Sequence, residues 1–315
     1  MNEAGLTIST MSLRESQSPA PDERPPLQEP FYAQYLLDNC STVEEVMASD
    51  ARIRVLDPLS HWLVCDRTGE CVTIEFLNGK TEYHAGDELP VKALTNSTYR
   101  DSVRAWRKGK LSDQSLVRFG IAADRAQGFD PDGREPAIDY AFHTLYLADG
   151  DRRGGPSAQW SIVFDAQHLQ IHFRTKRTPR IRSLDLNRVD FSCDAPALML
   201  DIHEDLSGDI SQDLEPYSHE RSVDQFVKFF QEWGMDIFRA RTERLVDHLE
   251  GFSCAQTIAA TRPTGSTQPI VQPGQADRSS WGGCLLGAGV LIPAITAICY
   301  GLRKQSRHWR VDAGE

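Results

Sequence analysis

Three closely spaced segments, in which apolar and polar residues alternate, constrain the fold more than any other feature of this sequence. They occupy residues 61–66, 71–77 and 81–84. A period of two is typical of strands that bury one face. The links are short, and one of them, Asn78-Gly79, favours a type I′ hairpin turn. Because connections of this length join antiparallel neighbours, the segments predict an antiparallel sheet.

The other expected elements fall into groups of strands and groups of helices. Further strands are expected at residues 5–11, 91–95, 160–165, 169–175 and 181–186. Helices are expected at residues 31–39, 99–106, 114–126, 136–147 and 223–249, and another should start near residue 41 behind a Ser or Thr cap. Residues 16–30 are proline-rich and indicate a surface loop. This grouping predicts an α+β fold rather than a doubly wound parallel sheet.

Charge and motif content exclude several functional classes. The formal net charge is −11, whereas nucleic-acid binding needs a basic face, so we expect no nucleic-acid partner. The sequence has no C-x-x-C motif, no zinc-ligand spacing and no glycine-rich phosphate loop, so we expect no metal and no cofactor. The 7 cysteines are odd in number and irregularly spaced, which does not indicate a disulfide framework. Cys40, Cys65 and Cys71 are expected to pack in the core as small apolar groups.

The C-terminal part of the chain has the pattern of a membrane anchor. Residues 255–280 are rich in Thr, Pro, Gly, Gln and Ser and predict a flexible linker. Residues 281–302 carry no charge and match the ~20 apolar residues that a transmembrane helix needs. A basic tail, residues 303–315, follows with Arg303, Lys304, Arg307 and Arg310. A buried helix or a hydrophobic tail is the alternative interpretation of residues 281–302.

Basic residues beside a span favour the cytoplasmic side of a membrane. Residues 1–254 would then lie outside the cytoplasm if a signal peptide precedes them. Without such a peptide the chain would be tail-anchored with this domain in the cytosol. Both interpretations describe a single-pass membrane protein.

Three local patterns carry residues suited to amide cleavage. Asn2 precedes the first expected strand, Asn96 lies between a strand and a helix, and Arg118 lies in the first turns of the next helix. Cleavage of an amide passes through a tetrahedral oxyanion, which fixed N–H donors stabilise. The backbone N–H of Asn2 and the side-chain amide of Asn96 could supply these donors, and Arg118 could orient or tune the nucleophile.

Each of these residues also has a purely structural explanation. Asn2 could form a turn before a strand, and Asn96 could cap a helix. Asn96-Ser97-Thr98 is also an N-glycosylation sequon. Arg118 could form an ordinary surface salt bridge.

Taken in order, the motifs resemble those of the choloylglycine hydrolase family, which includes bile salt hydrolases, penicillin V acylases and related linear amide C–N hydrolases. The resemblance covers residues 1–254. It rests on the segments MNEAGL, HWLVCDRTGECVTIEFLNGK, LTNSTYRDSV, QSLVRF, QWSIVFDAQHLQIHFRT and RIRSLDLNRVDFS.

This resemblance implies the fold of an N-terminal-nucleophile (Ntn) hydrolase, an αββα sandwich of antiparallel sheets between helix layers. It also implies a catalytic cysteine whose own α-amine acts as the base. Matched residue by residue, Asn2 and Asn96 correspond to the oxyanion-hole asparagines, and Arg118 corresponds to an active-site arginine. The substrate would be a small N-acyl amide.

The sequence departs from the family in one respect that bears on catalysis. The family's nucleophilic cysteine, with a nearby Arg and Asp, lies upstream of the segment matched by MNEAGL, so we expect a chain truncated at its start. The leading hypothesis is a membrane-tethered hydrolase of a linear C–N amide bond whose catalytic cysteine is absent from the chain as given. The alternative is an inactive, membrane-anchored remnant that acts as a binding or scaffold protein.

Overall fold

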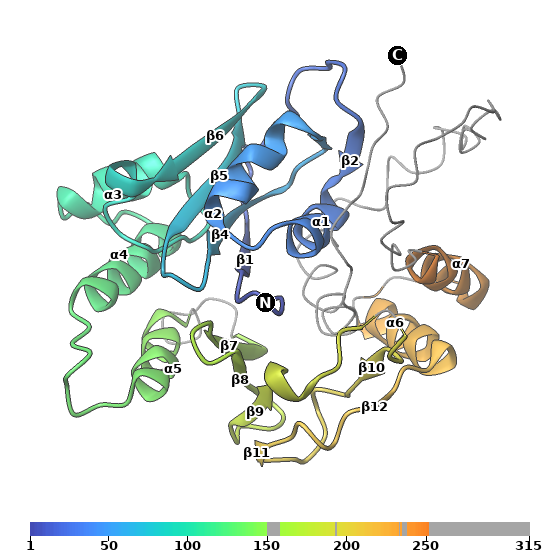
Figure 1. The fold of residues 1–315 in the computed structure, drawn as a ribbon. Helices are drawn as coiled ribbons and strands as arrows, with labels where there is room; N and C mark the ends of the chain where they lie inside the picture. The colour runs from blue at the N-terminus through green and yellow to red at the C-terminus, as the bar shows by residue number, and fades with distance from the viewer. Residues whose placement is uncertain (150–157, 193, 233, 235–237, 252–315) are drawn as a thin grey trace, which may run out of the picture.

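The computed structural model describes residues 1–149, 158–192, 194–232, 234 and 238–251, which form two sheets with surrounding helices (Figure 1). The expected linker, membrane span and basic tail lie outside these residues. Within the described part of the chain, no helix combines the length and apolar character needed to cross a membrane.

The first sheet is antiparallel and contains the three alternating segments at residues 61–66, 71–77 and 81–84. Its strand order is β1-β4-β5-β6, and the strands span Thr7–Ser12, Ser60–Cys65, Cys71–Leu77 and Lys80–Ala85. The turn between β5 and β6 has Asn78 at φ 54° and Gly79 at φ 74°, the left-handed conformation that a type I′ turn requires. The predicted strands and their antiparallel pairing are therefore confirmed.

Alternation along β4 and β5 gives this sheet two buried faces. Trp62 and Val64 on β4 face α1 (Tyr32–Asn39) and α2 (Val43–Ala48), where Tyr32 packs edge-to-face on Trp62 at 5.2 Å between ring centroids. The opposite face packs against α3 (Tyr99–Arg107) and α4 (Gln114–Gln127). The predicted α+β class is confirmed, and helices pack on both faces of this sheet.

The second sheet has the strand order β11-β9-β8-β7. β7, β8 and β9 (Trp160–Asp165, Gln170–Thr175 and Arg182–Asp185) are antiparallel, and β11 (Gly208–Asp209) is parallel to β9. Helix α5 (Ala137–Ala148) packs beside β7. The two sheets meet near the start of the chain, where Met1 packs with Leu169 and Leu184, and the Arg67 guanidinium donates to the Gln167 carbonyl oxygen at 2.8 Å.

Smaller elements complete the fold. Two short strand pairs are present, parallel β2 with β3 (Pro26–Gln28 and Arg54–Leu56) and antiparallel β10 with β12 (Leu198–Met199 and Glu215–Pro216). Among the described residues, single turns of 3-10 helix lie at Glu29–Phe31, Ser49–Ala51, Gly86–Glu88 and Leu186–Arg188. The expected loop at 16–30 therefore contains a short strand at its end, because the backbone of β2 pairs with β3.

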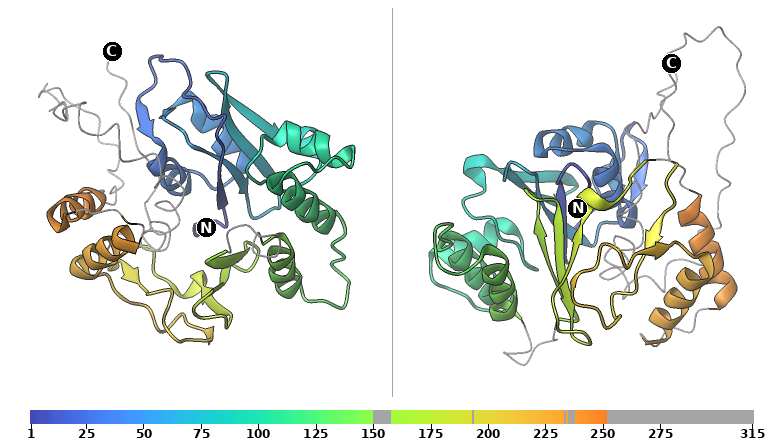
Figure 2. Two further views of the ribbon diagram at one scale, coloured as in Figure 1. Left: turned by 180° about the vertical axis from the view of Figure 1, so that it is seen from behind. Right: turned by 60° about the horizontal axis from the view of Figure 1, so that its bottom comes forward.

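Two predicted elements differ from the structure. The long helix expected at 223–249 is two helices, α6 (His219–Glu232) and α7 (Arg239–Glu250), and Gly234 between them has φ 68°, outside the helical region. The strand expected at 91–95 is an irregular buried segment, because the backbone N–H and carbonyl of Val91 both bond to the Tyr99 hydroxyl instead of to a neighbouring strand. The α6–α7 pair lies on the opposite side of the molecule from α3 and α4 (Figures 1 and 2).

Candidate functional site

Asn96 and Arg118 come together at the end of β1. The Arg118 guanidinium donates to the Asn96 side-chain oxygen at 2.7 Å, and the Asn96 Nδ2 group donates to the Ser12 carbonyl oxygen at 3.0 Å. These two bonds fix which way the amide faces, with its NH₂ group directed toward the last residue of β1. The Asn96 side chain is exposed, so this oriented donor is accessible from solvent.

The local sequence explains why these residues meet. Asp113 caps the start of α4 through its side chain, and Ser115 in the first turn accepts the backbone N–H of Asn96 at 2.8 Å. The Thr95 and Ser97 hydroxyls also bond to Ser115. Residues 95–97 are thereby attached to the start of α4, and one turn later this helix presents Arg118 to Asn96.

The structure does not bring Asn2 to this cluster. The Asn2 backbone N–H, expected to serve as an oxyanion donor, is bonded to the Leu6 carbonyl at 3.0 Å. Its buried side chain bonds to the carbonyl oxygens of Leu37 and Cys40, both at 2.8 Å. All of β1 separates Asn2 from the Ser12 end, and six strand residues at about 3.3 Å each rise roughly 20 Å. In this structure Asn2 forms a turn and anchors α1, which is the structural alternative considered above.

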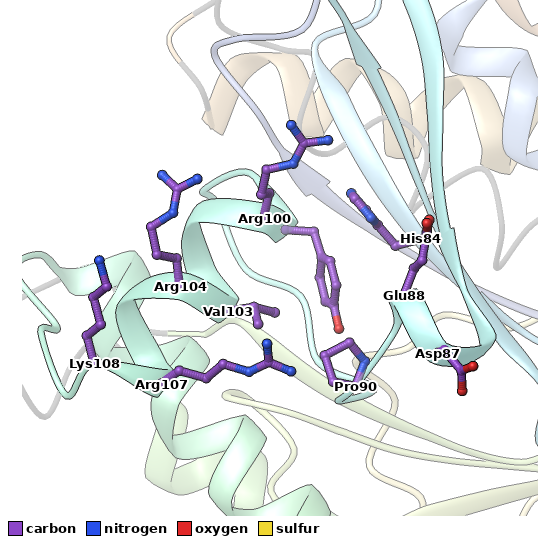
Figure 3. Close-up of a pocket in the computed structure, with 10 residues that line it drawn as sticks. His84, Asp87, Glu88, Pro90, Arg100, Val103, Arg104, Arg107 and Lys108 are labelled. Atoms are coloured by element: carbon purple, nitrogen blue, oxygen red, sulfur yellow. The ribbon is translucent and has the colours of Figure 1, made fainter.

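A buried network lies directly behind Asn96 and was not foreseen from the sequence. Glu75 of β5 is fully buried, and its Oε1 accepts His61 Nδ1 at 2.8 Å and the Tyr99 backbone N–H at 2.9 Å. His61 Nε2 bonds to the carbonyl oxygen of Thr95, the residue before Asn96. On the other side, His84 Nε2 lies 3.6 Å from Glu75 Oε2, and His84 lines a groove beside α3 (Figure 3).

The hydrogen bonds in this network favour the ionised form of the Glu75 carboxyl group. Burial alone would raise the pKa of the Glu75 carboxyl group. Hydrogen bonding from His61, the nearby His84 imidazole and the Tyr99 N–H outweighs this effect and lowers the pKa to about 2. The two ring nitrogens of His61 lie against Glu75 Oε1 and the Thr95 carbonyl oxygen. A buried hydrogen-bond network therefore holds the Thr95 carbonyl and, with it, the backbone at Asn96.

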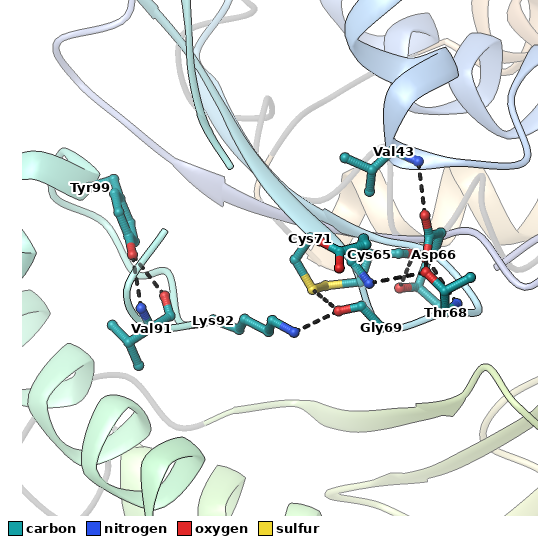
Figure 4. The surroundings of a disulfide bond; sticks show 11 residues. Val43, Cys65, Asp66, Thr68, Gly69, Cys71, Val91, Lys92 and Tyr99 are labelled. Atoms are coloured by element: carbon teal, nitrogen blue, oxygen red, sulfur yellow. Dashed lines mark hydrogen bonds between the residues drawn. A yellow bond between two sulfur atoms is a disulfide. The ribbon is translucent and has the colours of Figure 1, made fainter. Parts of the chain in front are cut away.

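None of the described cysteines can act as a thiolate nucleophile at Asn96. Cys65 and Cys71 form a disulfide across the β4–β5 hairpin (Figure 4), which corrects the prediction that both are free core thiols. Cys40 is a free, buried thiol as predicted, and burial raises its pKa to about 11. It lies beside Asn2, at the other end of β1 from Asn96. The other four cysteines of the sequence, Cys193, Cys254, Cys284 and Cys299, lie outside the described residues.

One group of potential metal ligands occurs in the described part of the chain, far from Asn96. His219 at the start of α6 faces Asp247 and Glu250 near the end of α7. The His219 imidazole contacts both carboxylates directly, because its Nδ1 lies 3.0 Å from Glu250 and its Nε2 lies 3.9 Å from Asp247. The hydrogen bond to Glu250 raises the pKa of His219. We interpret this group as an exposed ion-pair cluster between two helices.

Comparisons with known proteins agree with the fold and the motif order. No family model matches the chain. A penicillin V acylase of Pectobacterium atrosepticum is 24% identical over 234 residues, which cover 61% of this chain and 62% of that protein. The structure of penicillin V acylase from Agrobacterium tumefaciens has a TM-score of 0.60 at 24% identity and covers 69% of this chain and 76% of its own.

A mutant of conjugated bile acid hydrolase from Clostridium perfringens has a TM-score of 0.52 at 16% identity and covers 69% of this chain and 75% of its own. A second variant of the same enzyme gives a TM-score of 0.51 at 18% identity and covers 69% of this chain and 76% of its own. The resemblance stated from the sequence motifs is thus confirmed: the chain is similar to penicillin V acylases and bile acid hydrolases, the choloylglycine hydrolase group, and it has their Ntn-hydrolase type of α+β fold.

Proposed function

We propose that this chain is part of a hydrolase that cleaves a linear C–N amide bond in a small N-acyl substrate, and that the reacting carbonyl binds at Asn96. The chain spans 62% of the length of the penicillin V acylase that it matches in sequence, so the activity of the whole protein is part of the proposal. The observation that carries it is the Asn96 side-chain amide, oriented by Arg118 and exposed at the end of β1.

Asn96 has the properties of an oxyanion donor. One Nδ2 hydrogen bonds to the Ser12 carbonyl, and the second has no partner among the described residues. Because Arg118 holds the amide oxygen and Ser115 holds the backbone N–H, the donor is fixed before any substrate arrives. Fixed donors stabilise developing negative charge without reorganising during the reaction.

The nucleophile belongs, in this proposal, to a cysteine outside the described residues, as the family resemblance implies. Its thiolate attacks the amide carbon, the carbonyl oxygen becomes an oxyanion at Asn96, and the C–N bond breaks as the amine leaves with a proton. Water then hydrolyses the thioester and releases the acid and the thiol. In the first sheet β1 is an edge strand, so its open side can accept a further strand that carries the nucleophile.

The state of the described cysteines favours a second candidate function. With Cys65 and Cys71 joined and Cys40 buried, a chain that gains no further cysteine near Asn96 would bind an N-acyl compound without cleaving it. This candidate is the binding or scaffold remnant. Both candidates include the membrane anchor at residues 281–302, which the uncharged sequence supports.

The test uses the chain together with any residues that its gene encodes before Met1. The rate of hydrolysis of penicillin V and of glycine-conjugated bile acid is measured from the amount of amine product released. We expect Asn96→Ala to lower kcat/KM about 10²–10³-fold, as loss of one oxyanion donor does. Asn187→Ala is the control, because Asn187 also bonds through its side chain but lies in the second-sheet region. Equal activity of Asn96→Ala and wild type would remove Asn96 from the site, and binding without turnover would favour the remnant.

The anchor has a separate test. A chain that ends at residue 254 should stay in the supernatant after cell lysis and centrifugation, whereas the full chain should sediment with membranes and dissolve only in detergent. Identical fractionation of the two would contradict the anchor and leave the hydrolase proposal unaffected.

A further inference from the structure

A groove of about 520 Å³, lined by several charged residues, lies beside α3 and includes His84 of the buried network. Its lining comes from α3 and from the segment that follows β6 (Figure 3). A volume between about 300 and 1,000 Å³ is typical of small-molecule sites. Neither the amide-hydrolase proposal nor the motif analysis uses this groove.

One wall of the groove is cationic. Arg100, Arg104, Arg107 and Lys108 are spaced so that they share one side of α3. Arg100 lies 3.5 Å from Glu82, and Arg104 lies 3.0 Å from Asp101. Arg107 and Lys108 have no carboxylate within 4.0 Å in the part of the chain that the structure describes. Two positive charges therefore remain uncompensated in a chain whose net charge is −11.

The facing wall is anionic. Asp87 and Glu88 lie in the 3-10 turn Gly86–Glu88 that follows β6, and both line the groove. Neither carboxylate forms an ion pair with any residue in the ranges 1–149, 158–192, 194–232 and 238–251. Side chains of opposite charge thus line one groove and form no ion pair with each other.

Tyr99 links the two walls of the groove. It is the first residue of α3 and is buried, and its hydroxyl donates to the Val91 carbonyl oxygen at 2.8 Å and accepts the Val91 N–H at 3.3 Å (Figure 4). These bonds attach α3 to the segment that carries Asp87 and Glu88. Because the attachment is buried, it fixes the backbone of α3 relative to that segment.

We propose that this groove binds a small zwitterion of the amino-acid type, with its carboxylate at Arg107 and Lys108 and its ammonium group at Asp87 and Glu88. Such a ligand supplies the opposite charges that neither wall obtains from the other. Guanidinium groups bind carboxylates in a bidentate geometry, which suits Arg107 to the anionic end. The assignment does not depend on amide hydrolysis at Asn96.

Three probes of equal chain length test the requirement for both charges. The full chain, labelled with ¹⁵N, is titrated with 6-aminohexanoate, hexanoate and hexylamine at pH 7 and low salt. We expect 6-aminohexanoate to bind at least tenfold more tightly than either singly charged probe, with shifts in the amides of residues 84–90 and 99–108. Binding should weaken at 0.5 M NaCl because the contacts are exposed charge pairs. Equal affinity for all three probes, or no binding of 6-aminohexanoate up to about 20 mM, would overturn the proposal.

Substitutions on each wall separate a zwitterion from a simple anion. For a zwitterion, the R107A/K108A double variant and the D87N/E88Q double variant should each weaken 6-aminohexanoate binding about tenfold. For an anion alone, D87N/E88Q would tighten binding, because it removes repulsion, and this result would also overturn the proposal. Lys110→Ala and Glu15→Gln are matched controls, since both residues are exposed and neither lines the groove. All the substituted side chains lie on the surface, so thermal unfolding should be unchanged.

Discussion

Each of the two sheets buries one charged side chain completely, and the two charges are satisfied in different ways. Glu75 in the first sheet is paired with the His61 imidazole and accepts the Tyr99 N–H. Arg182 in the second sheet donates to the carbonyl oxygens of Ile202, Glu204 and Thr178, and its guanidinium lies 4.5 Å from the centre of the Phe173 ring. Glu75 thus depends mainly on a side chain, whereas Arg182 depends on backbone carbonyl groups.

This difference separates a titratable network from a fixed one. Acid can protonate Glu75 and so change its interactions with His61, which holds the carbonyl of Thr95. Burial lowers the pKa of Arg182, but arginine stays charged in proteins and carbonyl acceptors do not titrate. Only the first-sheet network can therefore transmit a change of pH to the backbone at Asn96.

Of the substitutions proposed for the two sheets, removal of the Glu75 carboxylate should lower the free energy of unfolding most. We expect Glu75→Ala to lower the free energy of unfolding by about 3–5 kcal/mol, because it leaves two buried groups, the His61 ring and the Tyr99 N–H, without their acceptor. Urea denaturation followed by fluorescence measures this change. Glu82→Ala, on the neighbouring strand and partly exposed, is the control and should cost less than about 1 kcal/mol. A loss below 1 kcal/mol for Glu75→Ala would mean that the buried hydrogen-bond network does not stabilise the fold.

Acid titration should distinguish the two sheets next. The pKa of Glu75 is lowered from 4.5 to about 2 in the folded chain, so its contribution to stability is present above the unfolded value and is lost as the pH falls toward 2. At 1.36 kcal/mol per unit, the loss is about 3 kcal/mol. Free energies of unfolding measured as the pH falls toward 2 should show this loss of stability in wild type and in the Arg182→Met variant. The same loss in Glu75→Gln would assign the acid sensitivity to other groups.

Substitution of the second buried charge should have a smaller effect that does not depend on pH. Arg182→Met keeps an apolar chain over Phe173 but leaves three carbonyl oxygens without a donor. We expect a loss of about 2–3 kcal/mol in urea denaturation, equal at pH 3 and pH 7 once the wild-type difference is subtracted. Arg180→Met is the matched control, because this side chain is half exposed. If the loss of unfolding free energy in Arg182→Met varied with pH, the proposed difference between a titratable Glu75 network and a fixed Arg182 network would be wrong.

The disulfide should have the smallest effect, and it should be confined to the first sheet. Cys65 and Cys71 are 6 residues apart, and closing so short a loop stabilises a chain by about 2 kcal/mol in the loop-entropy model. We expect the C65A/C71A double variant to lose about this amount. Hydrogen exchange should speed up in β4 and β5 and stay unchanged in β7–β9. Uniform acceleration in both sheets would show that they unfold as one unit.

The parts of the fold that could be predicted are those determined by local signals. The β5–β6 hairpin follows from Asn78-Gly79, whose left-handed backbone few other pairs adopt. Residues 91–95 are apolar and were expected to form a strand, but burial alone does not distinguish a strand from a buried irregular segment. The determining contact is the Tyr99 hydroxyl, which takes both hydrogen-bonding groups of Val91. Hydrophobic periodicity carries no information about that contact.

The residues of the candidate site could also be predicted only in part. Asn2, Asn96 and Arg118 were all assigned to the site from the order of the motifs and the family resemblance. Ser115 was missed, although it lies one turn before Arg118 and therefore on the same side of α4. Motif order carries no distance, and only the tertiary fold shows that Arg118 contacts Asn96 and that β1 separates Asn2 from them. The Cys65–Cys71 disulfide could have been predicted, because the expected hairpin places the two residues opposite each other.

The orientation of the Asn96 amide has one consequence for how this protein can be modified. Asn96-Ser97-Thr98 is an acceptor sequence for N-glycans, and a sugar would replace one of the two hydrogens on Nδ2. The remaining hydrogen could serve the Ser12 carbonyl or an incoming oxyanion, but not both. A glycosylated copy of this chain would keep its fold and lose its proposed donor, so the carbohydrate and the chemistry compete for a single nitrogen atom.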